Sequence, residues 1–213
     1  MPGIFEFKDE LFIMIYVMRH GESTINVAHR LTCKNLEGDL TPLGREQATK
    51  AALWLEAKDV QFDRVFVSPF HRAQQTAQIV TDHLGLEITT LAELSEMDCG
   101  EFEGRDDKYS WGKWQQIFDR WLAAEWDATF PGGESYRDAH TRLSAVLEKA
   151  LPHENTLMVT HGGITRAVIP YLCVNAAALQ RVKVIKNTAF ITLEHYDPGR
   201  YACRAWNLAE HLH

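Results

Sequence analysis

Apolar segments of strand length alternate with segments of helical periodicity along this chain of 213 residues, and this alternation restricts the fold more than any other feature. Parallel strands need a helical crossover between them, and the alternation supplies one between most of the apolar runs. Near the end, Asp197-Pro198-Gly199 separates two further apolar runs and predicts a hairpin. The sequence therefore predicts one α/β domain over residues 1–213. We expect a three-layer α/β/α sandwich whose central sheet is mostly parallel, with an antiparallel edge strand.

The predicted elements follow from composition and from helix-start signals. Thr41-Pro42 and Ser68-Pro69 each offer an N-cap hydroxyl followed by a proline, which suits the first turn of a helix. The predicted strands are Leu11–Met18, Arg64–Val67, Thr156–Thr160, Ala189–Tyr196 and Tyr201–Trp206. Helices are predicted over 42–57, 135–151 and Gly162–Leu172. A further helix is predicted after Ser68-Pro69, with Ala73, Ala77, Val80 and Leu84 on its inner face.

Two of the predicted strands end on a histidine that glycine follows. The first strand runs into Arg19-His20-Gly21, and a later one into His161-Gly162-Gly163. Glycine there would let the backbone turn tightly behind each histidine. Because ligands of open α/β sheets bind at the carboxyl ends of the strands, we expect both imidazoles to face one crevice.

Two arginines lie in the first turns of predicted helices, where a cation opposes the helix dipole. These are Arg72, after Ser68-Pro69, and Arg166, after His161. An anion bound between the helix starts would resolve the conflict, and a phosphoryl group is the anion that two arginines and two histidines suit. A metal site is the rival use of the histidines, but it calls for nearby carboxylates, and the arginines would repel the ion.

The charge and cysteine content exclude several classes of protein. The formal net charge is −7, from 22 basic and 29 acidic residues, which disfavours nucleic-acid and anionic-membrane partners. The four cysteines are far apart in the sequence and show no C-x-x-C pair, so we expect free thiols and a cytoplasmic location. The first apolar run is too short to cross a bilayer and follows acidic residues, so we expect no signal peptide.

An aromatic stripe at helical spacing lies between the second and third strand–helix units, at Trp111, Trp114, Phe118 and Trp121. The simpler interpretation is a helix that packs these rings onto the body of the domain. The alternative is that residues 106–130 form a helical lid-like insertion whose rings also line a substrate pocket. The two interpretations are compatible.

The order and spacing of several motifs resemble those of the histidine phosphatase, or phosphoglycerate mutase-like, family. The resemblance spans nearly the whole chain and is closest to the small phosphatases, such as α-ribazole phosphatase and the broad-specificity enzymes. The matching blocks are Arg19-His20-Gly21-Glu22-Ser23-x-x-Asn26, Leu40-Thr41-Pro42-Leu43-Gly44-x-x-Gln47-Ala48, Ser68-Pro69-x-x-Arg72-Ala73-x-Gln75-Thr76-Ala77, Leu94-x-Glu96-x-x-x-Gly100-x-x-Glu103-Gly104, Gly132-Gly133-Glu134-Ser135 and His161-Gly162-Gly163.

The resemblance implies a role for each site residue. His20 would be the nucleophile that forms a phosphohistidine, and Glu96 would be the general acid and then the base. Arg19, Arg72 and His161 would hold the phosphoryl oxygens. Asn26, Ser23 and Gly162 are assigned to substrate binding, although Ser23 could instead only brace its loop. The resemblance implies no metal and no organic cofactor.

The implied activity is hydrolysis of a small phosphorylated metabolite. A phosphoglycerate mutase is one alternative, but mutases typically carry Glu-Arg-His-Tyr-Gly where this chain has Glu96-Met97-Asp98-Cys99-Gly100. A phosphate-binding scaffold without turnover is the second alternative. Neither the role of Arg166 nor the oligomeric state can be read from the sequence, and a homodimer through a sheet edge or through residues 106–126 is conceivable.

Overall fold

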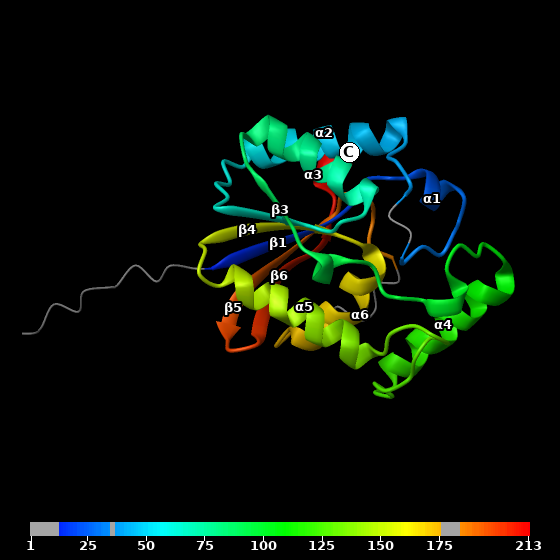
Figure 1. Cartoon of the computed structure of the whole chain (residues 1–213). Coiled ribbons are helices and arrows are strands. Elements are labelled where there is room, and N and C mark those ends of the chain that lie inside the picture. The colour runs from blue at the N-terminus through cyan, green and yellow to red at the C-terminus, as the bar shows by residue number, and fades with distance from the viewer. Residues whose placement is uncertain (1–12, 35–36, 176–183) are drawn as a thin grey trace, which may run out of the picture.

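The computed structural model describes residues 13–34, 37–175 and 184–213. Six strands form one sheet in the order β3-β2-β4-β1-β5-β6 (Figure 1). The strands are β1 (Met14–Arg19), β2 (Arg64–Val67), β3 (Ile88–Thr90), β4 (Asn155–Thr160), β5 (Phe190–Asp197) and β6 (Arg200–Leu208). The α-helices are α1 (Thr24–Val27), α2 (Pro42–Ala57), α3 (His71–Leu84), α4 (Lys108–Leu122), α5 (Tyr136–Ala150) and α6 (Gly162–Leu172). Short 3-10 helices are η1 (Ala92–Leu94), η2 (Gly100–Phe102) and η4 (Glu210–Leu212).

The sheet is mostly parallel, as predicted. Strands β1, β2, β3 and β4 pair in parallel, whereas β5 runs antiparallel to both β1 and β6. In the pairing of β1 with β4, Arg19 lies opposite Thr160. The residues that follow, His20 and His161, are therefore delivered to the same level at the carboxyl edge of the sheet.

Helices cover both faces of the sheet, which confirms the three-layer architecture (Figure 1). Helices α2 and α3 lie on one face, and α5 and α6 lie on the other. The alternation of side chains along β1 matches this arrangement. Met18 belongs to the core under α2 and α3, whereas Ile15 and Val17 belong to the larger core under α5 and α6.

The helix starts were predicted with mixed success. Thr41 caps α2, because its hydroxyl accepts a hydrogen bond from the Gly44 N–H at 3.0 Å. The prediction that Ser68 caps the next helix was wrong, since α3 begins at His71 and its N-cap residue is Phe70. The first predicted strand began at Leu11, but β1 begins at Met14, and Leu11 lies outside the described residues.

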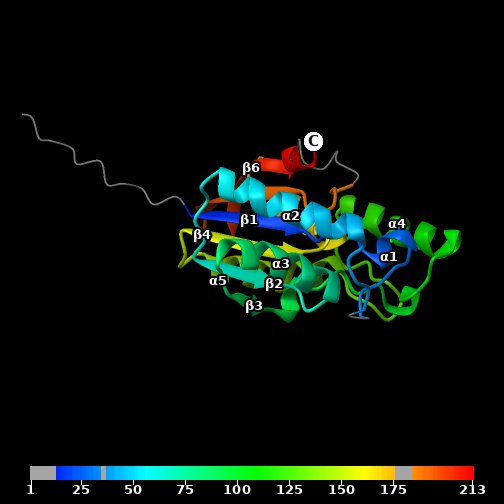
Figure 2. The ribbon, with the colours of Figure 1, turned by 90° about the horizontal axis from the view of Figure 1, so that it is seen from above.

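Helix α4 packs its aromatic stripe against the domain, as the simpler interpretation predicted. Phe118 and Trp121 are buried in the core, and Trp114 stacks on Phe118 with ring centroids 5.2 Å apart. The indole N–H of Trp111 donates to the His29 carbonyl at 2.7 Å, which ties α4 to the segment after α1. Figure 2 shows both α1 and α4 beyond the ends of the strands, at the edge where the histidines lie. None of the helices in the described ranges combines the length and the apolar character needed to cross a membrane.

Candidate active site

His20 follows β1 directly and is buried, with 3% of its surface exposed. Its Nδ1 lies 2.7 Å from the Gly21 carbonyl oxygen, which can only accept, so Nδ1 carries the proton. The other ring nitrogen, Nε2, then carries the lone pair, which accepts a hydrogen bond from Arg72 Nε at 3.2 Å. Burial first, and then the charges of Arg72 and Arg19, lower the pKa of His20 well below 6.5. The ring is therefore a neutral imidazole whose lone pair lies among cationic groups.

His161 follows β4 and lies beside His20, with ring centroids 5.2 Å apart. Its Nε2 lies 2.7 Å from the hydroxyl of Ser68, so this serine contacts the histidine and does not cap α3. Burial first, and then the charge of Arg72, lower the pKa of His161 well below 6.5. The structure thus brings together two neutral imidazoles from distant parts of the sequence.

The guanidinium groups of Arg19 and Arg72 adjoin the histidines, and both are partly anchored by carbonyls. Arg19 Nη1 donates to the Ile185 carbonyl at 2.5 Å, and Arg72 Nη2 donates to the Thr32 carbonyl at 3.3 Å. Burial is the main reason that the pKa of Arg72 is lowered to about 10, a value that still leaves the side chain cationic at neutral pH.

Three buried nitrogens around His20 have no hydrogen-bond partner among the described residues. They are Arg19 Nε, Arg72 Nη1 and His161 Nδ1. Buried donors without acceptors are costly in a folded protein, so a cluster of them points to an acceptor-rich ligand. Arg19 Nε and Arg72 Nη1 are donors, and His161 Nδ1 is a third when the Ser68 hydroxyl donates to its Nε2. A tetrahedral oxyanion is chemically suited to such a cluster.

Glu96 reaches the same region from the segment after η1. One carboxylate oxygen accepts the Gly163 N–H at 2.9 Å, and the other accepts the Ile164 N–H at 2.6 Å. The carboxylate is therefore held at the N-terminus of α6, where the helix dipole favours a negative charge. Its charge also acts on both Arg19 and Arg72, because it raises the pKa of each against the stronger effect of burial.

The glycines near the histidines are required by close approach rather than by a left-handed backbone. A Cβ on Gly21 would lie 2.5 Å from the Gly44 carbonyl oxygen, and one on Gly162 would lie 3.1 Å from Arg19 Nε. A Cβ on Gly163 would lie 2.6 Å from Glu96 Oε1. In the described part of the chain these three are not among the residues with positive φ, so the close contacts, and not a left-handed backbone, account for glycine at these positions.

Ser23 and Asn26 lie in the loop after His20, where their observed contacts brace that loop. Ser23 caps α1, and Asn26 Oδ1 accepts from the Ser23 N–H at 3.1 Å. Asn187, which the sequence analysis did not identify, donates to Asn26 Oδ1 at 3.3 Å and to the His20 carbonyl at 3.0 Å. No motif marks Asn187, so only the fold shows that it supports the histidine loop.

Arg166 and Arg142 differ from the arginines at the site. The Arg166 guanidinium stacks over the Phe118 ring at 4.0 Å, which joins α6 to α4. Arg142, another residue the sequence analysis missed, donates to the carbonyls of Glu93 and Ser95 at 2.7 Å and of Glu96 at 3.1 Å. Arg142 therefore fixes the segment that carries Glu96.

Comparison with known proteins agrees with this geometry. Residues 15–209 match the histidine phosphatase superfamily (branch 1). The chain belongs to the histidine phosphatase superfamily. It is 31% identical over 170 residues to a 2,3-bisphosphoglycerate-dependent phosphoglycerate mutase of Methylorubrum extorquens strain PA1, an alignment that covers 75% of this chain and 78% of that protein.

Solved structures with the same fold include two phosphatases. The α-ribazole phosphatase of Shigella flexneri matches with a TM-score of 0.72 and 26% identity, over 92% of this chain and 96% of that one. A mycobacterial glucosyl-3-phosphoglycerate phosphatase in complex with VO3 matches with a TM-score of 0.73 and 25% identity, over 92% and 99% of the two chains. The resemblance and the fold inferred from the sequence are thus confirmed. Members of this superfamily act on small phosphorylated substrates.

Proposed function

We propose that this histidine phosphatase superfamily member hydrolyses a small phosphorylated metabolite through a phosphohistidine on His20. The observation that carries the proposal is the state of His20. Its Nδ1 donates to the Gly21 carbonyl, and its Nε2 accepts from Arg72 Nε. Two arginine nitrogens at the site, Arg19 Nε and Arg72 Nη1, have no hydrogen-bond partner among the described residues. A neutral, oriented imidazole surrounded by such donors is suited to attack phosphorus.

The proposed reaction has two in-line displacements. Nε2 of His20 bonds to phosphorus while the ester P–O bond breaks, and Glu96 gives a proton to the leaving oxygen. Water then attacks the phosphohistidine, Glu96 takes up a proton from that water, and phosphate leaves with His20 neutral again. Arg19 and Arg72 would neutralise the charge of the phosphoryl oxygens in both steps, and the neutral His161 would hydrogen-bond them, so the scheme uses neither a metal ion nor an organic cofactor.

Substrate binding at the edge of this site is assigned to Ser23, Asn26 and Gly162. Their positions around the histidine loop support the assignment, although the contacts of Ser23 and Asn26 are with the loop itself. Residues 106–130, with α4 packed beside the same edge, would form a lid-like insertion within a single domain. A cytoplasmic location and a homodimer also stay predictions, and light scattering of the purified protein would test the dimer.

Hydrolysis is preferred to the mutase reaction because of the segment after Glu96. It reads Met97-Asp98-Cys99-Gly100 and lacks the basic residues that would grip a second anionic group. The mutase is kept as the second candidate, since the Methylorubrum mutase is 31% identical to this chain.

The deciding experiment compares two substrates. We expect release of phosphate from p-nitrophenyl phosphate between about pH 4 and pH 8, the range in which histidine and carboxyl groups titrate. With 3-phosphoglycerate and the 2,3-bisphosphate primer, rapid isomerisation without net phosphate release would instead establish a mutase. Wild-type protein that releases no phosphate at any pH and does not isomerise would favour a phosphate-binding scaffold.

A further inference from the structure

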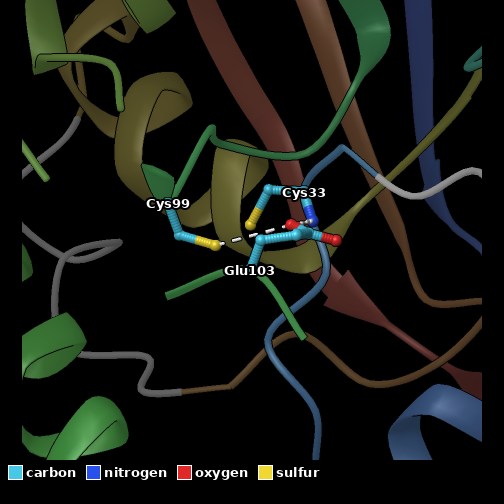
Figure 3. A group of neighbouring side chains, drawn as sticks. All are labelled: Cys33, Cys99 and Glu103. Atoms are coloured by element: carbon cyan, nitrogen blue, oxygen red, sulfur yellow. Dashed lines mark hydrogen bonds between the residues drawn. The ribbon is translucent and has the colours of Figure 1, made fainter. Parts of the chain in front are cut away.

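Two buried cysteines and a glutamate form a compact cluster outside the proposed catalytic residues (Figure 3). One ligand atom from each of Cys33, Cys99 and Glu103 lies within 4.8 Å of the other two. Cys99 Sγ lies 3.8 Å from Glu103 Oε2, and Figure 3 shows both sulfurs and the carboxylate facing a common centre. Cys99 is fully buried and Cys33 nearly so.

The geometry points to a zinc site, and we propose that Cys33, Cys99 and Glu103 bind one Zn²⁺ ion. Thiolate and carboxylate are both ordinary zinc ligands. Zn–S bonds of about 2.3 Å in a tetrahedron separate two sulfurs by about 3.8 Å. Because the ligand atoms here all lie within 4.8 Å of one another, the two sulfurs would close by at most about 1 Å.

Local structure already holds two of the ligands. Cys99 precedes η2 and Glu103 follows it, so this 3-10 turn places both side chains on one side. Glu103 Oε2 also accepts the Cys33 N–H at 2.6 Å, which fixes the third ligand's backbone against the carboxylate. Lys34, after Cys33, and Asp98, before Cys99, form a partly exposed ion pair at 3.2 Å, so the sequence neighbours of both cysteines reach the surface.

The nearby Arg72 does not prevent binding, because the exchange is neutral in charge. Zn²⁺ binding to two thiols forms two Zn–S bonds and releases two protons to solvent, so the net charge of the cluster is the same before and after.

Such an ion would link two segments that serve the active site. Thr32, whose carbonyl accepts from Arg72, precedes Cys33, and Cys99 lies three residues after Glu96. The site would therefore be structural, holding the segment that anchors Arg72 against the segment that carries Glu96. It goes beyond the proposed reaction, which uses no metal, and its test needs no substrate.

The test uses Co²⁺ as a spectroscopic substitute for Zn²⁺, with the full chain kept in a non-thiol reductant so that its cysteines stay reduced. We expect one equivalent of Co²⁺ to give a thiolate-to-cobalt charge-transfer band that Zn²⁺ then displaces. Wild-type protein that shows no such band, or a band that Zn²⁺ does not displace, would overturn the proposal without any variant.

Variants assign the ligands. Cys99→Ser and Cys33→Ser should abolish the band, and competition with a chromophoric chelator should show a loss of zinc affinity larger than the ~10–100-fold cost of an outer-shell change. The control is Cys173→Ser/Cys203→Ser, because these are also buried, neighbouring thiols, but they have no third ligand among the described residues. The band should persist in this control, and its loss there or its survival in Cys99→Ser would contradict the assignment.

Discussion

At the scale of single residues, the hydrogen bond from His20 to the Gly21 carbonyl decides which ring nitrogen is available. The sequence indicated that His20 lies at a strand tip, but the tautomer depends on a carbonyl direction that only the folded loop defines. The same loop places Nε2 3.2 Å from Arg72, so this arginine affects both the charge of the ring and the binding of a phosphoryl group.

Arg72→Gln should lower kcat/KM by about 10²–10³-fold, the usual cost of removing one donor that stabilises transition-state charge. It should also move the acid limb of the kcat/KM profile. Burial is the largest cause of the low pKa of His20 and the charge of Arg72 is the second largest. Only the neutral ring attacks. The wild-type limb should therefore lie below pH 6.5, and the variant's limb closer to 6.5. A pH profile of both proteins measures this. An acid limb at the same pH in both would show that Arg72 does not lower the pKa of His20.

Gly163→Ala should displace the Glu96 carboxylate, since the added Cβ would lie 2.6 Å from Oε1. We expect kcat to fall by about 10²-fold, the lower end of the contribution of a general acid. Gly112→Ala is the matched control, because a Cβ there meets nothing within 4 Å. Gly112 lies inside α4, so this control should keep its activity and gain about 0.5–1 kcal/mol in the free energy of unfolding. Equal kcat values for the two variants would contradict the placement of Glu96.

At the scale of elements, Arg142 of α5 forms an ion pair with Glu134, just before that helix, and the pair positions the segment of Glu96. Arg142 and Glu134 are both largely buried and lie 2.7 Å apart, and Glu134 also accepts the Asp98 N–H at 2.8 Å. The pair therefore holds the backbone on both sides of Glu96 by hydrogen bonds. Neither partner contacts the histidines among the described contacts.

Arg142→Met should lower the free energy of unfolding by about 3 kcal/mol, because it leaves a buried carboxylate unpaired. It should lower kcat as well, through the position of Glu96. Arg137→Met on the same helix is the control, since Arg137 pairs with Asp127 where both side chains are more than half exposed. Such a surface pair contributes at most about 1 kcal/mol. Urea denaturation compares the two variants. Similar losses in the free energy of unfolding would show that the buried pair of Arg142 does not hold this segment more strongly than a surface pair does.

The elements that the sequence predicted well are those with a long periodic pattern. Helix α6 was predicted with its observed ends, and α2 was predicted from its cap and its buried alanines. The sequence analysis missed β3, because three residues with little burial give no periodicity. It also missed α1, a single turn held by its capping box.

At the scale of the whole molecule, burial of neutral histidines makes stability depend on pH. His20 and His161 have folded-state pKa values well below 6.5, whereas in the unfolded chain each titrates near 6.5. The unfolded chain thus binds more protons below pH 6.5, so stability is full above that pH and is lost as the pH falls towards the folded-state values.

We expect the free energy of unfolding to fall by up to about 1.4 kcal/mol per pH unit for each of the two rings below pH 6.5. Urea denaturation of wild type and His20→Gln at several pH values isolates one ring. The variant should have the shallower slope by about that amount, and identical slopes would show that His20 is not buried neutral in the folded protein.

Most of the site could be predicted, because the histidines and arginines of the motifs end a strand or begin a helix, whereas Glu96 lies between two short 3-10 helices and was assigned from the family resemblance. The residues that support it could not. Asn187 and Arg142 bond mainly backbone carbonyls of segments far away in the sequence, and such contacts leave no spacing pattern. Ser68 was misassigned for a related reason, since its signal for a helix cap is local, whereas its partner His161 comes from another strand.

The central claim is that strands β1 and β4 deliver two imidazoles to one phosphoryl group and that His20 Nε2 attacks it. The most direct measurement is rapid alkaline quenching during turnover of ³²P-labelled substrate, followed by peptide mapping. We predict label on the peptide that contains His20, absent in His20→Ala and chased by unlabelled substrate. Label on another residue, or turnover that survives in His20→Ala, would contradict the account.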